Sequence, residues 1–370
     1  MVEAVTRPTR LEISKGAVAH NIRTVKDVSG ADKVFLTVKS NAYGMGLVPM
    51  AQAAVAGGVY GLGVAVLDEA LALRHQRITA PILILGISPV QYAELMAVQH
   101  IMATVVSLDW LRIAEENLTG EQPLPVTIGI DTGMGRIGFR DRDTLAEAIQ
   151  FVRNHNDKFE YVGLSTHFAE SDSADTRYFE MQLERWHQLT DGLPKPKYYH
   201  VANSGATMYH ATEVPHEVVR VGTVIYGVEP SRGELADGKN LRPVMALRSE
   251  INFVKRLPAG EGISYSHKYT TSTDEWIGTV PIGYGDGWVR KLMGFNVIID
   301  GQYAPIVGQV AMDQLMIRLP HEYPEGTTVT LIGKDGGLEN TIEDVAQHAD
   351  LAPWEVTTGL QARIHRVLVN

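Results

Sequence analysis

The stretch VFLTVKSNAYGMG, residues 34–46, points to the fold and raises the first chemical question. Its opening residues, Val34–Val38, form a nearly continuous apolar run, as in a strand buried on both faces of a parallel sheet. Lys39 follows at once, and Tyr43 and two glycines come within the next turn. A lone lysine at a strand end is most often a solvated surface residue. A chemical role for Lys39 therefore needs support from other features of the sequence.

Short apolar runs of the same kind recur along the first two thirds of the chain and alternate with stretches that have helical periodicity. Eight such βα units in succession predict a (β/α)8 barrel. The predicted strands are Val34–Val38, Gly61–Ala65, Ile82–Leu85, Met102–Val106, Pro125–Asp131, Phe159–Thr166, Tyr198–Ala202 and Glu217–Val221.

After about Leu241 the pattern changes to strands joined by glycine turns, and Asp300-Gly301 between two apolar arms predicts a hairpin. A short helix is expected after Asn340, whose side chain we expect to cap it. We therefore predict a barrel domain over residues 1–240 and a β-rich domain over residues 241–370, with the first dozen residues joining the second domain. The polar, turn-rich segment 231–243 is the predicted linker.

The composition excludes several classes of function. A net charge of −10 without a long basic stretch argues against nucleic acid or an acidic membrane surface as partner. The chain has no cysteine, and hence no disulfide or thiolate nucleophile, and we predict no metal site. The N-terminal sequence lacks the apolar core of a signal peptide and no run reaches the length of a membrane span, so a cytoplasmic location is expected.

In a (β/α)8 barrel the carboxyl ends of the strands build the active site, which places Lys39 at the mouth of the barrel. Burial there lowers the pKa of a lysine and frees its amine for Schiff-base chemistry. His167, after the sixth predicted strand, and Arg220, at the end of the eighth, would share that mouth.

Motifs along nearly the whole chain resemble those of the alanine racemases, pyridoxal 5'-phosphate (PLP) enzymes made of a (β/α)8 barrel and a β domain. The segment VKSNAYGMG resembles their cofactor-lysine motif. The other matching segments, in order, are DTGMGRIGF (131–139), STHFAESD (165–172), HVANSGA (200–206), RVGTVIYG (220–227), GISYSHKY (262–269), PIGYGDGW (281–288) and VGQVAMDQ (307–314).

The resemblance implies that Lys39 binds PLP covalently and also serves as one of two bases, with Tyr265 as the second. Racemisation removes a proton from one face of Cα and returns it to the other, which one base on each face achieves. The ordinary pKa of tyrosine, about 10, is too high for a base at neutral pH, so cationic neighbours would have to lower it. The implied reaction interconverts L-alanine and D-alanine and supplies D-alanine for cell-wall peptidoglycan.

The resemblance also implies how the cofactor is held. Arg220 would face the pyridine nitrogen, where a guanidinium keeps that nitrogen unprotonated and weakens the ring as an electron sink. His167 would support this arginine. Trp354 stands at a phosphate-contacting position where the family commonly has tyrosine, and the other implied phosphate contacts are Tyr43, Asn203, Ser204, Gly222 and Thr223.

On the substrate side, the resemblance implies that Arg136 approaches the phenolic oxygen of the cofactor and the substrate carboxylate. Met312 would add its backbone N–H to that carboxylate, and Asp313 and Tyr284 are the other implied substrate contacts. In the family the barrel of one subunit and the β domain of another share a site. Tyr265, Met312 and Asp313 would therefore act with Lys39 of a second copy of the chain, which implies a homodimer.

One position departs from the family pattern in a way that affects chemistry. Many members carry a lysine two residues before the aspartate of DTGMGR, modified to a carbamate that positions the arginine. This chain has Gly129 there, so that device is absent and Arg136 must be held by other groups.

Four alternatives stay open at this stage. The first is a broader small-amino-acid racemase that also takes serine. The second is an NAD-dependent dehydrogenase, because GMGRIG (133–138) satisfies G-x-G-x-x-G after a predicted strand. A basic-amino-acid decarboxylase of the same fold group would place a glutamate where Arg220 stands, and a non-enzymatic PLP-carrying barrel would leave the β domain and Tyr265 without a role.

Overall fold

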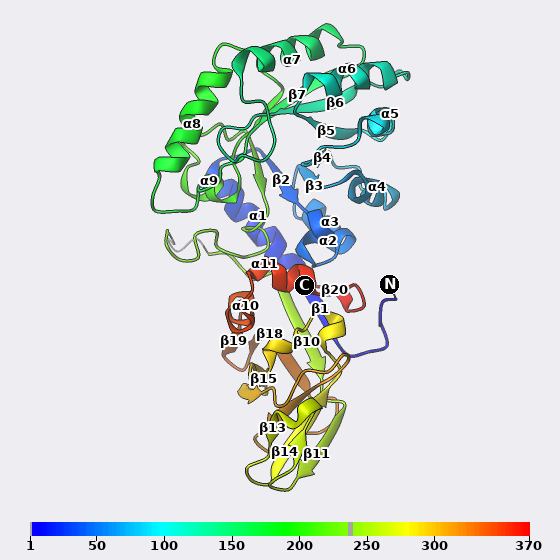
Figure 1. The fold of residues 1–370 in the computed structure, drawn as a ribbon, viewed down its shortest axis with the longest axis vertical. Helices are drawn as coiled ribbons and strands as arrows, with labels where there is room; N and C mark the ends of the chain where they lie inside the picture. The colour runs from blue at the N-terminus through cyan, green and yellow to red at the C-terminus, as the bar shows by residue number, and fades with distance from the viewer. Residues whose placement is uncertain (1, 236–239) are drawn as a thin grey trace. The chain divides into compact units, whose positions relative to one another are not determined.

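The computed structural model describes residues 2–235 and 240–370 (Figure 1). The chain forms two compact units and passes between them more than once. We call residues 15–40 and 50–242 the barrel unit, and residues 1–14, 41–49 and 243–370 the β unit. Within the predicted linker, residues 236–239 lie outside the described residues.

The barrel unit contains a parallel sheet of eight strands in the order β8-β7-β6-β5-β4-β3-β2-β9. The backbone N–H of Arg220 in β9 donates to the carbonyl of Ala202 after β8 at 2.9 Å, which joins the two ends of the sheet. All eight predicted strands are confirmed, and they are β2 (Lys33–Thr37), β3 (Gly61–Val64), β4 (Ile82–Ile84), β5 (Ile101–Val105), β6 (Leu124–Gly129), β7 (Phe159–Ser165), β8 (Tyr198–His200) and β9 (Val218–Val221).

Two predicted strand ends are wrong by two residues. β6 stops at Gly129 rather than Asp131, because the backbone N–H of Asp131 turns to the carbonyl of Phe139 at 3.0 Å. β8 stops at His200 rather than Ala202. Beyond β6 the chain turns into a loop at the mouth of the barrel, whereas beyond β8 the carbonyl of Ala202 still accepts from the N–H of Arg220.

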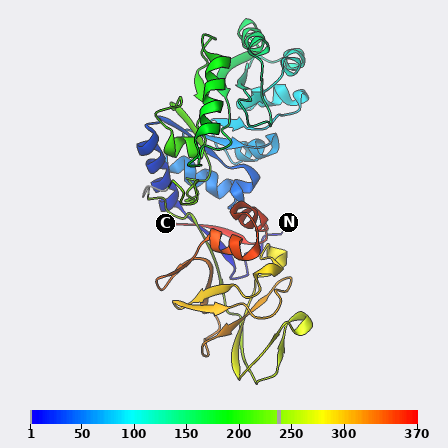
Figure 2. The same cartoon turned by 60° about the vertical axis from the view of Figure 1, so that its left-hand side comes forward.

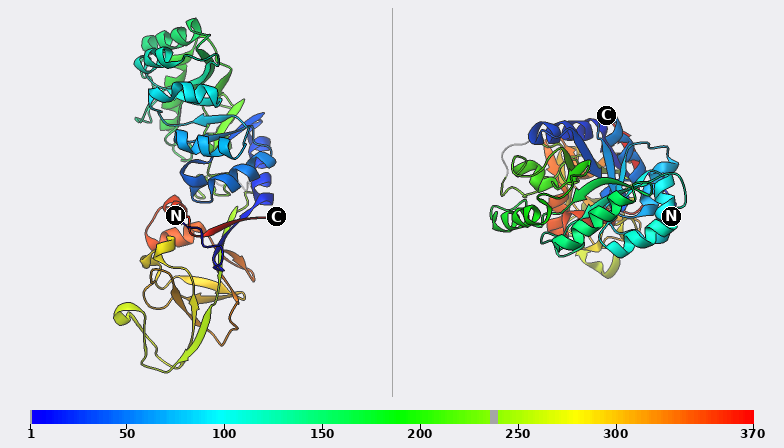
Figure 3. Two further views of the ribbon diagram at one scale, coloured as in Figure 1. Left: turned by 90° about the vertical axis from the view of Figure 1, so that its right-hand side faces the viewer. Right: turned by 90° about the horizontal axis from the view of Figure 1, so that it is seen from above.

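Helices lie outside the strands of the barrel unit, as Figure 2 and Figure 3 show from other sides. In α7 (Arg142–Asn154) the buried residues Leu145, Ala148, Ile149 and Val152 repeat at helical spacing, and this face packs on β7. The other helices are α1 (Lys15–Ser29), α3 (Leu47–Ala56), α4 (Leu67–His75), α5 (Ala93–Val98), α6 (Leu108–Asn117), α8 (Arg177–Thr190) and α9 (Ser204–Tyr209).

The short helix that directly follows β2, α2 (Lys39–Tyr43), is left-handed from its second residue onward. Ser40, Asn41, Ala42 and Tyr43 have φ values of 53°, 55°, 54° and 54°. For residues with a Cβ this conformation costs roughly 1–2 kcal/mol each, so surrounding contacts must hold the turn in place.

The β unit is built on a sheet with the strand order β16-β15-β18-β10-β1-β20, in which β19 also pairs with β18. A smaller sheet has the order β11-β14-β17, and β12 pairs with β13. The strands are β1 (Arg10–Ser14), β10 (Met245–Glu250), β11 (Phe253–Leu257), β12 (Gly262–Ile263), β13 (Tyr269–Thr270), β14 (Glu275–Val280), β15 (Asn296–Ile299), β16 (Gln302–Pro305), β17 (Leu315–Leu319), β18 (Thr328–Asp335), β19 (Leu338–Asn340) and β20 (His365–Val369).

The predicted hairpin at Asp300-Gly301 is confirmed, since β15 and β16 pair through a two-residue turn. Both turn residues have positive φ, 46° at Asp300 and 68° at Gly301, as a type I′ turn requires. In the described part of the chain, no helix is both long and apolar enough to cross a membrane.

The predicted short helix is confirmed as α10 (Ile342–Ala349), but the predicted cap is wrong by one residue. Thr341 caps the helix by accepting from the N–H of Asp344 at 3.0 Å. The Asn340 amide is buried and donates instead to the carbonyl of Asn296 at 2.8 Å. A second helix, α11 (Pro353–Gly359), was not predicted, although Pro353 at its first position is a helix-start signal.

Candidate active site

Four of the predicted site residues of the barrel unit come together at the carboxyl ends of its strands. Lys39 follows β2, Arg136 lies in the loop after β6, His167 follows β7, and Arg220 is in β9. Their charges act on one another: Arg136 affects the pKa values of Lys39, His167 and Arg220, and Lys39 affects that of His167. The rim of the barrel therefore carries a cluster of cationic side chains.

Backbone carbonyl groups hold the guanidinium of Arg220. Its Nη2 donates to the carbonyl of Thr166 at 2.8 Å and its Nη1 donates to the carbonyl of His200. Nη2 also lies 3.5 Å from Nδ1 of His167. Burial and the charge of Arg136 lower the pKa of Arg220 to about 10, which still leaves it protonated at neutral pH. Thr166 and His200 were not predicted as site residues, because a carbonyl acceptor leaves no side-chain signal in the sequence.

The histidines beside this guanidinium are neutral. Burial, and then the charges of Arg220, Arg136 and Lys39, lower the pKa of His167 to about 3. Burial and Arg220 do the same for His200, which is fully buried and also has a pKa of about 3. The imidazoles thus add no positive charge to a cluster that already holds three cations.

The amine of Lys39 is set for nucleophilic chemistry. Burial, and then the charge of Arg136, lower its pKa, while the carboxylate of Glu69 acts in the opposite direction. A lowered pKa raises the fraction of neutral amine at neutral pH, and the neutral amine is the form that attacks a carbonyl group.

Glu69 also fixes the backbone next to Lys39. One carboxylate oxygen accepts from the N–H of Ser40 at 2.6 Å, and the other accepts from the N–H of Ala65 at 2.8 Å. Ser40 is the first residue of the left-handed turn and Ala65 follows β3. A single side chain therefore ties the start of the strained turn to the neighbouring strand end.

The predicted phosphate contacts of the barrel unit gather where β9 ends and α9 begins. The N–H of Gly222 donates to Oγ of Ser204 at 3.1 Å. Asn203 caps α9 by accepting from the N–H of Ala206 at 3.0 Å. Its Oδ1 also accepts from Oγ of Ser171 at 2.7 Å. Thr223 directly follows Gly222 and is half-buried.

In the β unit, Tyr43 and Trp354 are in contact. Their rings meet edge to face with centroids 4.9 Å apart, and burial raises the pKa of Tyr43 to about 12. Gly44 comes next at φ 85°, where a Cβ would lie 1.8 Å from the carbonyl oxygen of Thr357. Only glycine fits this approach between the chain after Tyr43 and the helix that carries Trp354.

A second group of predicted site residues in the β unit is braced by main-chain hydrogen bonds. The N–H of Tyr284 donates to the carbonyl of Ala311 at 3.0 Å, and the N–H of Gly285 donates to the carbonyl of Met312 at 2.8 Å. Tyr284, Met312 and Asp313 all have exposed side chains. These bonds hold the Tyr284 segment and the Met312 loop side by side.

A buried carboxylate, Asp286, anchors this pair of segments. It forms ion pairs with Arg7 at 2.5 Å and Arg363 at 3.1 Å, and Arg363 also pairs with Asp313 at 2.8 Å. Arg363 was not predicted as a site residue, because nothing in the sequence places it beside Asp313. Arg363 thus fixes the side chain of Asp313 through a contact between distant parts of the chain.

Tyr265 lies on an exposed loop of the β unit with 65% of its surface accessible. The neighbouring Ser264, Ser266 and His267 have φ values of 64°, 59° and 44°. Oγ of Ser264 donates to the carbonyl of Gln309 at 2.6 Å and secures the loop. Such backbone strain in non-glycine residues concentrates at functional sites.

The glycine turn that satisfied G-x-G-x-x-G is closed by its own chain. Oδ1 of Asp131 accepts from the N–H of Gly133 at 3.0 Å and from that of Gly135 at 2.9 Å. These N–H groups are therefore already satisfied and do not form a cradle for a pyrophosphate.

Comparisons with known proteins agree with this arrangement. Residues 13–230 match the model of the alanine racemase N-terminal domain, and residues 244–368 match that of the alanine racemase C-terminal domain. The chain belongs to the alanine racemase family. The dehydrogenase alternative is therefore wrong, because both alanine racemase domain models together match nearly the whole chain.

The relatives of this chain are named for more than one substrate. A protein of Oenococcus oeni called lysine racemase is 51% identical, and the alignment covers 100% of both chains. The alanine racemase of Ligilactobacillus salivarius is 44% identical over 99% of this chain and 100% of its own.

Solved structures similar to this chain are also named for different substrates. The crystal structure of alanine racemase from Oenococcus oeni has a TM-score of 0.94 at 49% identity, with 100% of both chains covered. Histidine racemase from Leuconostoc mesenteroides has a TM-score of 0.96 at 33% identity, again over 100% of both chains. Membership of the family thus establishes an amino-acid racemase fold and leaves the substrate to be decided by experiment.

The position of Glu69 near Lys39 predicts how the Lys39 amine responds to a change at Glu69. The substitution Glu69→Gln removes the negative charge that raises the pKa of Lys39, so we expect the Lys39 amine to titrate at lower pH. The measurement is the pH dependence of modification of Lys39 by an amine-reactive reagent, followed by peptide mass spectrometry.

Asp68→Asn is the matched control, since Asp68 is an exposed carboxylate one residue earlier in the same helix. It should leave the titration of Lys39 unchanged. An equal shift in both variants, or none in Glu69→Gln, would contradict the role assigned to Glu69.

Proposed function

We propose that this protein is a PLP-dependent alanine racemase in which Lys39 and Tyr265 act as bases on opposite faces of Cα. The observation that carries the proposal is the cationic cluster at the mouth of the barrel. Arg136 is close enough to act electrostatically on both Lys39 and Arg220, and the adjacent imidazole of His167 is neutral. Such a set suits a ligand that brings a phosphate, a carboxylate and a carbonyl group.

The residues of the barrel unit fit PLP by their chemistry. Lys39 provides an amine of lowered pKa, which can condense with an aldehyde. Ser204, Gly222 and Thr223 lie together where backbone N–H and hydroxyl groups suit a phosphate. Arg220 is held by two carbonyl oxygens and would donate to a ring nitrogen, which keeps that nitrogen unprotonated.

PLP, when bound, withdraws electrons from the Cα of an attached amino acid and so weakens its C–H bond. The chain's own groups move the proton. The amine of Lys39 would accept or return it on one face, and the hydroxyl of Tyr265 would do so on the other. Arg136 would orient the substrate carboxylate through its guanidinium.

We infer further that the active enzyme is a homodimer with shared sites. Tyr265, Met312 and Asp313 belong to the β unit, where their side chains are exposed, and Arg363 braces Asp313. Exposed side chains that are held in a fixed arrangement are suited to contact a second copy of the chain. In this proposal they complete the site that contains Lys39 of the partner copy.

We propose that the physiological role of the enzyme is to supply D-alanine for peptidoglycan.

Lysine is the second candidate substrate, and serine a third. The specific observation for lysine is the relative at 51% identity that is named lysine racemase. Trp354 packs on Tyr43 at a position where the family commonly has tyrosine, and its larger side chain would alter the space open to a substrate side chain.

The direct test is racemisation by the purified protein with PLP, using alanine, serine, lysine and histidine as separate substrates. We expect the highest kcat/KM for alanine, and borohydride reduction followed by peptide mapping should place the pyridoxyl group on Lys39. A higher kcat/KM for lysine would replace alanine in the proposal. A label on another lysine would overturn the assignment of Lys39.

A second prediction concerns the two bases. Tyr265→Phe should lower kcat by roughly 10²–10⁴-fold while PLP stays bound, because it removes one proton-transfer group and leaves the barrel unit intact. Exchange of the Cα hydrogen with deuterium from solvent should then persist for only one enantiomer of alanine.

A mixture of Lys39→Ala and Tyr265→Phe subunits tests the dimer in the same system. Neither variant alone should be active, but a mixed dimer would contain one intact site and recover part of the activity. Equal loss of exchange from both enantiomers would contradict the two-base arrangement, and no recovery on mixing would contradict the shared site.

The third prediction turns on Gly129. A Cβ at this buried position would already lie 3.1 Å from Cγ1 of Val106, so the site has no room for a longer side chain without a shift. No carbamate can form on glycine, and the described residues offer Arg136 no hydrogen bond or ion pair. We therefore expect KM and kcat for L-alanine not to respond to bicarbonate in degassed buffer.

Chloride provides the contrasting measurement. If a bound anion replaces the carbamate beside Arg136, varying chloride should change KM, since the arginine steadies the substrate carboxylate. A clear dependence on bicarbonate would mean that another lysine has taken over the carbamate's role.

A further inference from the structure

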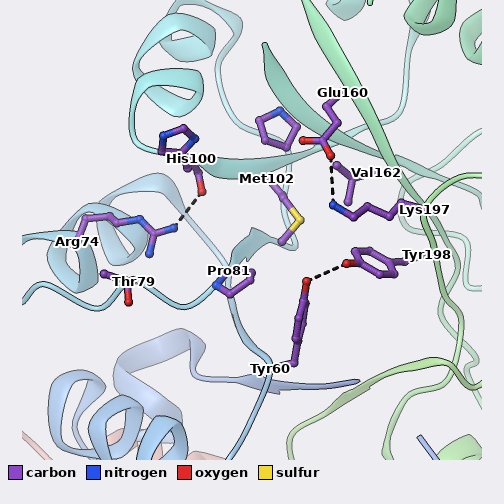
Figure 4. Close-up of a pocket in the computed structure, with 11 residues that line it drawn as sticks. Tyr60, Arg74, Thr79, Pro81, His100, Met102, Glu160, Val162, Lys197 and Tyr198 are labelled. Atoms are coloured by element: carbon purple, nitrogen blue, oxygen red, sulfur yellow. Dashed lines mark hydrogen bonds and ion pairs between the residues drawn. The ribbon is translucent and has the colours of Figure 1, made fainter. Parts of the chain in front are cut away.

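A cavity of about 230 Å³, whose lining side chains are drawn in Figure 4, opens at the amino ends of the barrel strands. Its walls come from the amino ends of the strands: Tyr60 precedes β3, Pro81 precedes β4, His100 precedes β5, and Glu160 and Tyr198 lie at the starts of β7 and β8. Parallel strands put their amino ends on one rim and their carboxyl ends on the other. The cavity is therefore separate from the candidate active site.

The floor of the cavity is apolar. Met102 and Val162 line it and belong to a buried cluster that also contains Phe35. Tyr60 and Tyr198 pack against the same cluster and form one wall. Pockets for drug-sized ligands span about 300–1,000 Å³, so a cavity of this size suits a smaller molecule with a compact apolar body.

The two tyrosines leave a hydrogen-bond donor available. Their hydroxyl oxygens lie 2.8 Å apart, and one hydroxyl donates to the other. Each hydroxyl has one proton, so the accepting hydroxyl keeps its own O–H to donate elsewhere. Burial and the hydrogen bond with Tyr60 raise the pKa of Tyr198 to about 12, which keeps it protonated.

Two lysines lie against the rings of these tyrosines. Nζ of Lys33 lies 5.5 Å from the ring centroids of both Tyr60 and Tyr198, and Nζ of Lys197 lies 5.6 Å from that of Tyr198. Glu160, at 3.4 Å from Lys197, is the carboxylate among the residues that line the cavity. Lys197 and Glu160 thus pair with each other, and Lys33, which packs on the tyrosine rings and does not itself line the cavity, adds a positive charge behind them, in a chain whose net charge is −10.

Arg74 adds a third positive charge and is firmly held. Its guanidinium donates to the carbonyl oxygens of Gln99, Ile78, Ala80 and His100 at 2.7–2.9 Å. These bonds fix the loops at the rim, so the cavity is preformed and a ligand need not order it.

We propose that this cavity is a second ligand site, specific for a small organic carboxylate with a flat apolar body. The apolar part would lie on Met102 and Val162, and the carboxylate would accept from the free tyrosine O–H near Lys33 and Lys197. The net positive charge favours an anion over a neutral molecule, and the pairing of Glu160 with Lys197 leaves no free carboxylate for an ammonium group.

The test uses benzoate as the probe and the full-length holoenzyme, with binding measured by calorimetry and by ligand-observed NMR. Benzoate should bind saturably, while benzamide, its neutral counterpart, should bind more weakly. The double variant Lys33→Gln/Lys197→Gln should weaken benzoate binding roughly tenfold or more, as expected when charge-assisted contacts are lost. Lys195→Gln, an exposed lysine two residues from Lys197, is the matched control and should bind as the parent does.

Arg136→Gln separates this site from the other end of the barrel. Benzoate affinity should be unchanged in that variant, and weakening there would place the probe at the candidate active site and overturn the proposal. Absence of saturable binding, or equal affinity in the parent and the Lys33→Gln/Lys197→Gln variant, would also overturn it. Circular dichroism of each variant verifies that the comparison is made between folded proteins.

Discussion

The closure of the parallel sheet is the constraint on which the candidate site depends. The N–H of Arg220 in the last strand bonds to the carbonyl of Ala202 after the neighbouring strand, while its guanidinium reaches the carbonyl groups of Thr166 and His200. One residue thus joins the two ends of the sheet and supplies the central cation of the site. Because all eight strands point the same way, closing the sheet also brings the loops after β2, β6 and β7 to the same rim.

Charge at this rim is arranged so that like charges stay close without being neutralised. Arg136 acts on both Lys39 and Arg220, and the histidines at this rim lose their protons instead of adding to the repulsion. Keeping these cations close together costs free energy, which the carboxylate of Glu69 offsets in part at Lys39 and which a bound anion would offset further. The loops of such a site are therefore expected to be less stable before a ligand binds than afterwards.

The sequence predicts the positions of the strands well, and it predicts contacts between particular side chains less well. Buried parallel strands are continuous apolar runs, so each could be recognised alone, and Lys39 and Arg220 could be assigned to strand ends from position. The brace from Arg363 to Asp313 could not be foreseen, because the two residues are far apart in the chain. Thr341 and Asn340 are adjacent residues that both suit a cap, and only the packing of Asn340 against Asn296 decides between them.

The left-handed turn after Lys39 has a consequence for how the protein reaches its working form. Four residues with side chains in this conformation together cost about 4–8 kcal/mol, which is comparable with the whole stability of many domains. A partly folded chain lacks the hydrogen bond that the Ser40 N–H donates to Glu69 and the close contact of Gly44 with Thr357, so nothing in it offsets the cost of the turn. We therefore expect the turn that follows Lys39 to form only together with these contacts, so incompletely folded copies of the protein should not hold the amine in its reactive position.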